Sequence, residues 1–177
     1  MRTRRAAAAV APALAAAVLL TATLTGCSPI VALTPATHAN DPACADVIVR
    51  LPQTLEGLAR RETNAQATGA WGDPAQVLLR CGVTEPTASD LPCVQVYNTD
   101  WLRDDTNAPS YVFTSYGRTP AIAVVIDQRK LTPGLVLGDL DSVVAFTKPN
   151  GRACSSIEDS LGSTATPGPT PTPTPTR

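Results

Sequence analysis

Three aspartates beside a tryptophan are the strongest candidates for acid–base chemistry in this sequence. Asp100, Asp104 and Asp105 surround Trp101 within six residues. Two carboxyl groups next to an aromatic ring could act as the acid and base of a sugar-cleaving site. Carboxylates in a polar turn between strands are more often solvated and structural. The pattern therefore names these aspartates as candidates for hydrolysis and assigns none of them as catalytic.

Each of the other common catalytic arrangements lacks at least one residue or motif that it requires. The only histidine, His38, lies in a segment with the composition of a linker, so a Ser-His or Cys-His pair has no base inside the folded region. The sequence also contains no Cys-x-x-Cys spacing and no glycine-rich phosphate loop. We therefore expect no metal and no cofactor, and we favour a protein that is not an enzyme.

Three aromatic residues are the candidates for a binding surface. Trp71, Trp101 and Tyr111 each combine a large apolar ring with a polar tip, which suits contact with a carbohydrate or a protein partner if the rings are exposed. For Trp71 a structural role is favoured, because Trp71-Gly72-Asp73-Pro74 has the composition of a turn that leads into a strand. In that interpretation the Trp71 ring covers one end of the core.

The first 26 residues are built like a secretory signal peptide. Three arginines among the first five residues precede an apolar run from Ala6 to Leu24, which Pro12 interrupts once. The run contains 19 residues and is also long enough for a membrane-spanning helix, so its length alone does not separate a signal from an anchor. The residues at its end decide between them.

The junction Leu24-Thr25-Gly26-Cys27 resembles the lipobox of bacterial lipoproteins. The resemblance implies that the Cys27 thiol receives a diacylglycerol and becomes the new N-terminus after cleavage. Two acyl chains are the number needed for stable membrane attachment. We therefore expect a mature chain that is lipid-anchored to the cell membrane on its extracytoplasmic face.

Composition divides the chain after the signal into three parts. Residues 27–41 have the composition of a linker, residues 42–161 contain all seven aromatic residues and predict one globular domain, and residues 162–177 predict a disordered Thr/Pro-rich tail. Loss of the three signal-peptide arginines changes the formal net charge from −1 to −4. This mildly acidic chain gives no reason to expect nucleic acid as a partner.

Local patterns predict two helices and several strands in the domain. Asp41 and Pro42 suit the start of a helix that Pro52 ends, and Thr132 with Pro133 suits the start of a second helix. Alternating or continuous apolar residues predict strands over 76–83, 93–97, 111–116 and 121–127. This order predicts an α+β fold of two layers, with a mainly antiparallel sheet of about four to five strands and two flanking helices.

The four cysteines after Cys27 predict two disulfides in an exported protein. Cys44 belongs to the apolar stripe of the first helix and Cys81 to the apolar face of its strand, so their side chains should meet. Cys93 points to the opposite side of its strand from Val94, and Cys154 follows the second helix. We prefer Cys44 with Cys81 and Cys93 with Cys154. A Cys81–Cys93 bridge remains the close alternative, and a four-thiolate zinc site is disfavoured by the spacing.

Several segments of the domain together carry a family resemblance. They are Cys44, Trp71-Gly72-Asp73-Pro74, Arg80-Cys81-Gly82-Val83, Asp100-Trp101-Leu102, and Tyr111-Val112-Phe113-Thr114 with Gly117-Arg118. With these segments the domain resembles an actinobacterial envelope family known as domain of unknown function 3515. The family has no assigned activity, so the resemblance implies a compartment and no mechanism. It also implies that Cys44 and Cys81 are a family pair and that Cys93 and Cys154 are an additional one.

Three functions are compatible with these features. We favour a non-enzymatic lipoprotein that binds an envelope protein or a cell-wall component, or that has a structural role in the envelope. The first alternative is a hydrolase of envelope polymers that uses Asp100, Asp104 or Asp105. The second is a small protease-inhibitor-like protein that presents a disulfide-braced loop from Thr84 to Leu91.

Overall fold

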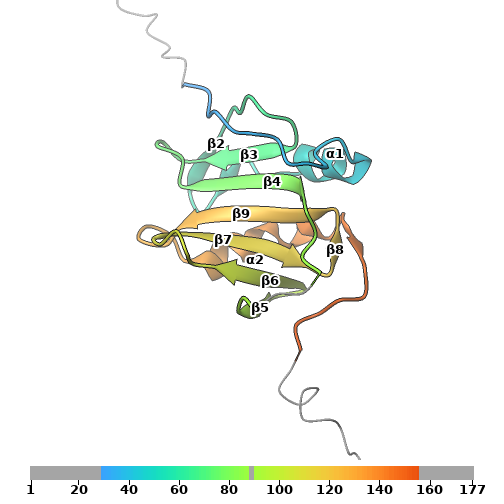
Figure 1. Ribbon diagram of the computed structural model, residues 1–177. Coiled ribbons are helices and arrows are strands. Elements are labelled where there is room, and N and C mark those ends of the chain that lie inside the picture. The colour runs from blue at the N-terminus through green and yellow to red at the C-terminus, as the bar shows by residue number, and fades with distance from the viewer. Residues whose placement is uncertain (1–28, 88–89, 156–177) are drawn as a thin grey trace, which may run out of the picture.

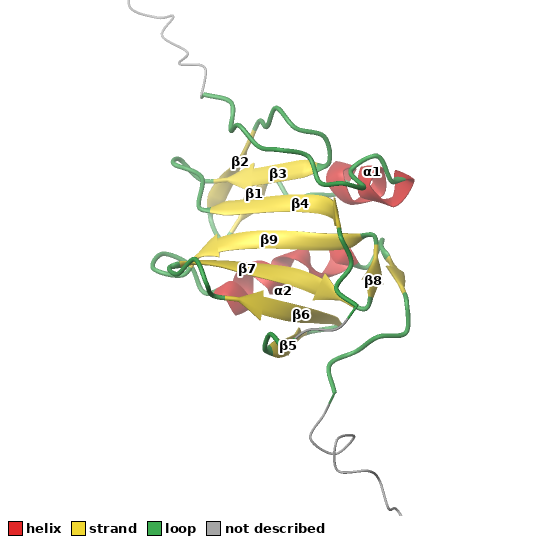
Figure 2. Cartoon of the chain, in the orientation of Figure 1, coloured by secondary structure: helices red, strands yellow, loops and turns green. Residues whose placement is uncertain are grey.

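An eight-stranded antiparallel sheet forms the centre of the protein, and both helices pack against one of its faces (Figure 1). The computed structural model describes residues 29–87 and 90–155. The strands follow the order β1-β2-β3-β4-β9-β7-β6-β5 across the sheet, and β10 pairs with β8 in a separate two-stranded sheet. The opposite face of the large sheet, turned toward the viewer in Figure 2, carries no helix in the described part of the chain.

The strands vary from two to seven residues in length, and the longest lie in the middle of the large sheet. They are β1 (Thr54–Leu55), β2 (Leu58–Arg61), β3 (Thr68–Trp71), β4 (Val77–Val83), β5 (Cys93–Val96), β6 (Thr99–Asp104), β7 (Ser110–Tyr116), β8 (Arg118–Thr119), β9 (Ala121–Asp127) and β10 (Lys148–Pro149).

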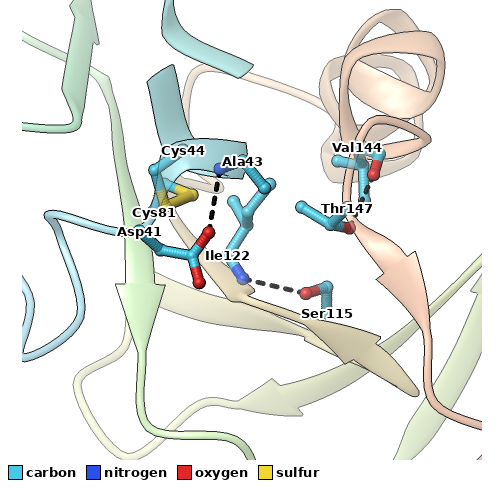
Figure 3. The surroundings of a disulfide bond; sticks show 8 residues. All are labelled: Asp41, Ala43, Cys44, Cys81, Ser115, Ile122, Val144 and Thr147. Carbon is cyan, nitrogen blue, oxygen red and sulfur yellow. Dashed lines mark hydrogen bonds between the residues drawn. A yellow bond between two sulfur atoms is a disulfide. The ribbon is translucent and has the colours of Figure 1, made fainter. Parts of the chain in front are cut away.

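Both helices begin where the sequence predicts. In α1 (Pro42–Val49), the Asp41 carboxylate accepts a hydrogen bond from the Ala43 N–H at 2.8 Å (Figure 3), which satisfies one of the free donors at the helix start. In α2 (Pro133–Val144), proline occupies the first position as expected, but the Thr132 side chain makes no capping hydrogen bond.

The core lies between the helices and the inner face of the sheet. The buried residues of α2 include all four that its periodicity assigns to the sheet side, namely Val136, Leu140, Val143 and Val144. They pack in one cluster with inward residues of α1, β4, β6, β7 and β9. Ser115 is buried among them and its hydroxyl accepts a hydrogen bond from the Ile122 N–H at 2.9 Å, so this polar group has a partner (Figure 3).

The predicted α+β fold with four to five strands is wrong, because the protein is mostly sheet and its large sheet has eight strands. The strands of the large sheet that sequence analysis missed are β1, β2, β3 and β6, and it also missed β8 and β10 of the two-stranded sheet. The first three are only two to four residues long and too short to show a clear period of two. The strand β6 contains Asp100 and Asp104, and these acids made a strand resemble a polar turn.

The segment before α1, which composition assigns to a linker, is bonded to the domain from Val31 onward. Val31 forms a parallel bridge with Thr63, and the His38 N–H donates to the Gly82 carbonyl at 2.9 Å. Gly82 makes this approach feasible, because its φ of +87° is favourable only for glycine and a Cβ there would overlap the His38 backbone. Backbone hydrogen bonds of this kind leave no apolar pattern in the sequence.

Candidate functional site

The two disulfides connect the same cysteines that the sequence analysis paired from the expected directions of their side chains. Cys44 of α1 and Cys81 of β4 are both fully buried, and their bridge joins the helix to the inner face of the sheet (Figure 3). Cys93 of β5 and Cys154 form the second bridge with Cα atoms 5.6 Å apart, on the other side of the sheet from Val94. Both predicted pairings are confirmed, and the Cys81–Cys93 alternative is excluded.

The two tryptophans that were candidates for a binding surface are buried. Trp71 and Trp101 both have zero exposed surface. The Trp71 indole N–H donates to the Pro52 carbonyl at 2.9 Å, so the ring belongs to the core as the structural interpretation required. Tyr111 is half-buried, and the Arg103 guanidinium lies 5.9 Å from the centre of its ring. A shared binding surface requires exposed rings, and neither indole ring is exposed.

Asp100 and Asp104 lie on strand β6 instead of a turn, and Asp105 directly follows that strand. The backbone positions of Asp100 and Asp104 are separated by four residues of strand, or about 13 Å, and the side chains lie on the same face. Paired glycosidase carboxyl groups are about 5 to 9.5 Å apart. Along β6, the backbone positions of Asp100 and Asp104 are therefore farther apart than the paired carboxyl groups of a glycosidase.

Each of these three carboxylates has a partner that holds it in place. Asp100 Oδ2 accepts the Cys154 N–H at 2.8 Å, while its other carboxylate oxygen is buried and has no partner among the described residues. Asp104 accepts hydrogen bonds from the Thr106 hydroxyl and N–H, and these bonds lower the pKa of the Asp104 carboxyl. Asp105 forms an exposed ion pair with Arg103 at 3.5 Å. A general acid needs a raised pKa instead.

A hollow of about 390 Å³ lies on the helix-free side of the sheet, and sequence analysis did not anticipate it. Apolar side chains dominate its lining, and Arg80 supplies a cation at its edge. Among the lining residues are Arg80, Val83, Pro86, Leu102, Val112 and Thr114. Thr84, Pro86 and Leu91 belong to the loop that was considered as an inhibitor loop, so the described part of that loop borders the hollow.

Some sequence-based predictions fall outside the described residues. Cys27, the signal-like segment and the Thr/Pro-rich tail all lie there. Within residues 29–87 and 90–155, no group of three or more His, Cys, Asp or Glu side chains could hold a metal ion. None of the helices in this part of the chain has the length and apolar character needed to cross a bilayer.

The fold and the two disulfides define the class of domain. One antiparallel sheet carries two helices on a single face, and two disulfides brace the structure. Residues 5–153 match the family model described as protein of unknown function DUF3515. The match covers most of the chain, so the chain belongs to the DUF3515 family. No curated protein and no solved structure matches it significantly.

The residue range of the family match includes three of the four cysteines that form the two disulfides. The match includes Cys44, Cys81 and Cys93 and ends one residue before Cys154. The matched region therefore holds both cysteines of the first bridge and only one cysteine of the second. It also includes most of the signal-like segment, which makes that segment part of the same family model as the domain.

Proposed function

We propose that this chain is a lipoprotein of an actinobacterial cell envelope, anchored on the extracytoplasmic face of the membrane by lipid on Cys27. The observation that carries the proposal is the sequence Leu24-Thr25-Gly26-Cys27 at the end of a basic and then apolar segment. A diacylglycerol on Cys27 supplies the two chains that stable attachment requires.

The disulfides support an extracytoplasmic location. Four of the five cysteines form two bridges, and such bridges form and persist in oxidising compartments. Cys27 is the cysteine that remains outside them. The chain thus has one cysteine in the position for lipid attachment and two pairs that brace the domain.

The domain itself acts as a non-enzymatic binding or structural module of the envelope. This part of the proposal is supported by the acids of β6, which hold local structure: Asp100 holds the Cys154 backbone, and Asp104 closes the turn at Thr106. The partner is an envelope protein or a cell-wall component, contacted through a surface other than the buried indoles of Trp71 and Trp101. No nucleic acid and no cofactor form part of this proposal.

Replacement of the proposed lipid acceptor tests the anchor. We expect Cys27→Ala to abolish incorporation of labelled palmitate and to leave the unprocessed precursor, because both lipid transfer and cleavage depend on that thiol. The measurement is palmitate labelling and gel mobility of the full chain in a host that processes lipoproteins. A matched control, Ser28→Ala, keeps the cysteine and should be labelled and processed normally. Unchanged labelling of the Cys27→Ala chain would contradict the proposal.

A further inference from the structure

The first described residues are held against the end of strand β2. The Val31 N–H donates to the Glu62 carbonyl at 2.9 Å, and the Asn64 N–H donates to the Val31 carbonyl at 3.3 Å. The Asn64 side chain accepts the Leu33 N–H at 2.8 Å. These bonds fix residues 31–33 to the domain instead of leaving them free to move as a linker.

Arg61 extends this attachment to Pro29. Its side chain is only 9% exposed, and its guanidinium donates to the Pro29 carbonyl at 2.7 Å and to the Gly72 carbonyl at 2.9 Å. The same group forms an ion pair with Asp73 at 3.0 Å. A nearly buried guanidinium with three partners has little freedom, so the position of Pro29 is set by the domain.

The distance from this fixed point to the lipid site is short. Cys27 precedes Pro29 by two residues, and two fully extended residues span about 7 Å. A lipid on Cys27 would thus have almost no spacer between the bilayer and the folded domain.

We infer that the domain lies directly on the membrane surface, with the end of the sheet around β2 toward the bilayer and Ile30 in contact with phospholipid. The inference rests on the lipid anchor proposed above. Ile30 is 65% exposed although it is apolar, and it is the residue next to the Arg61-bound Pro29. Contact with the lipid interface would remove this side chain from water.

The charges nearby indicate that the tether and the apolar contact, not attraction to anionic lipid, set this orientation. Arg61 is neutralised by Asp73, and Glu62, whose backbone carbonyl accepts the Val31 N–H, adds an exposed acidic residue. The occupant of this surface is therefore the phospholipid interface in general, without a requirement for acidic headgroups.

The opposite end of the domain then points away from the membrane. The two described ends of the chain leave the domain at opposite edges of the sheet (Figure 1). Six strand spacings separate β2 from β5, which is bonded to Cys154, and this corresponds to roughly 30 Å. The segment after Ser155 therefore starts at the membrane-distal end.

Photocrosslinking in cell membranes tests this orientation. A benzophenone amino acid replaces Ile30 in the full chain, and a matched variant carries it at Tyr97, which is 73% exposed and follows β5 at the other edge of the sheet. Phospholipids are labelled with radioactive phosphate, which the diacylglycerol on Cys27 does not carry. We expect the label on position 30 to exceed the label on position 97 by on the order of tenfold.

A spacer variant separates tethering from other causes of lipid contact. An insertion of about 20 glycine and serine residues between Ser28 and Pro29 gives a flexible reach of about 25 Å. We expect this insertion to lower the crosslink at position 30 toward the value at position 97. A crosslink at position 30 that is no stronger than at position 97, or that yields only protein adducts, would overturn the inference.

Parallel palmitate labelling distinguishes the two proposals. Absence of palmitate on Cys27 refutes the lipid anchor itself. Normal palmitate labelling together with equal phosphate labelling at positions 30 and 97 refutes only the orientation and leaves the anchor in place.

Discussion

At the scale of single residues, Gly82 decides whether the segment before α1 can attach to the sheet. Its φ of +87° is strained for any residue with a side chain, and an added Cβ would overlap the His38 backbone. We expect Gly82→Ala to lower the free energy of unfolding by about 2 to 4 kcal/mol, since backbone strain and steric overlap add. Urea denaturation measures this change.

Gly134 provides the control for this substitution. It lies in the first turn of α2, and a Cβ there would have nothing within 4 Å. Gly134→Ala should leave stability unchanged or raise it by about 0.5 to 1 kcal/mol, because alanine reduces the freedom of the unfolded chain. Equal effects of the two substitutions would show that the close approach of His38 to β4 contributes nothing.

At the scale of elements, the helices and the bridges were predictable and several strands were not. Asp41 followed by Pro42 is a strong local signal for a helix start, and Cys81 belongs to the apolar face formed by every second residue of a seven-residue strand. Such signals need no knowledge of distant partners. The strand β3, by contrast, has the sequence Thr-Gly-Ala-Trp, and pairing with β4 makes it a strand. Tertiary pairing of that kind cannot be found from local propensity.

Strand β6 shows why the candidate site was misplaced. Its inward residues include Trp101 and its outward residues include Asp100 and Asp104, which is the alternation expected of a strand with one buried face. Together with the neighbouring Asp105, these acids give the segment the composition of a polar turn, which hides the alternation in the sequence. The attachment of the segment before α1 to the sheet left no sequence signal for a different reason, since the hydrogen bonds of Val31 and His38 use only the backbone.

The two bridges differ in access to solvent, and this predicts the order of their reduction. Cys44 and Cys81 are fully buried in the core, whereas Cys93 and Cys154 are half-buried beside the edge strand β5. Exchange requires a thiolate to reach a sulfur atom, so we expect a mild thiol reductant to open the Cys93–Cys154 bridge first. Differential alkylation followed by peptide mapping measures the order.

A variant that lacks the Cys93–Cys154 bridge tests whether the Cys44–Cys81 bridge resists reduction by itself. By loop-entropy reasoning, each bridge contributes about 3 to 5 kcal/mol. The chain with Cys93→Ala and Cys154→Ala should keep the Cys44–Cys81 bridge intact under the same mild reductant. Alkylation of Cys44 and Cys81 ahead of the other pair in the unmodified chain would contradict the burial argument.

At the scale of the whole molecule, the proposed orientation would give the sheet a membrane-proximal end and a distal end. The order of the strands places β2, with Arg61 and the attached Pro29, near one edge and β5, with the Cys93–Cys154 bridge, at the other. Neither helix covers the second face of the sheet, on which the hollow beside Arg80 lies. In the proposed orientation, attachment at one edge would leave the second face and the far edge of the sheet accessible to other envelope components.

If the module binds and does not catalyse, the whole protein should work without the three acids near Trp101. We expect a chain with Asp100→Asn, Asp104→Asn and Asp105→Asn to restore the envelope phenotype of a strain that lacks the native copy. Asparagine keeps an acceptor for the Cys154 N–H and for Thr106, and the exposed pair of Asp105 with Arg103 contributes only about 0 to 1 kcal/mol. The variant should therefore fold and reach the membrane.

Complementation by the triple variant and polymer cleavage by the unmodified protein together decide between binding and catalysis. Thermal unfolding and palmitate labelling first establish that the variant is folded and anchored. The purified unmodified protein is then incubated with isolated envelope polymers, and we expect no release of soluble fragments, because the register of β6 separates Asp100 from Asp104 by about 13 Å. Cleavage by the unmodified protein, combined with failure of a folded and anchored variant to complement, would replace the binding module by a carboxylate-dependent hydrolase.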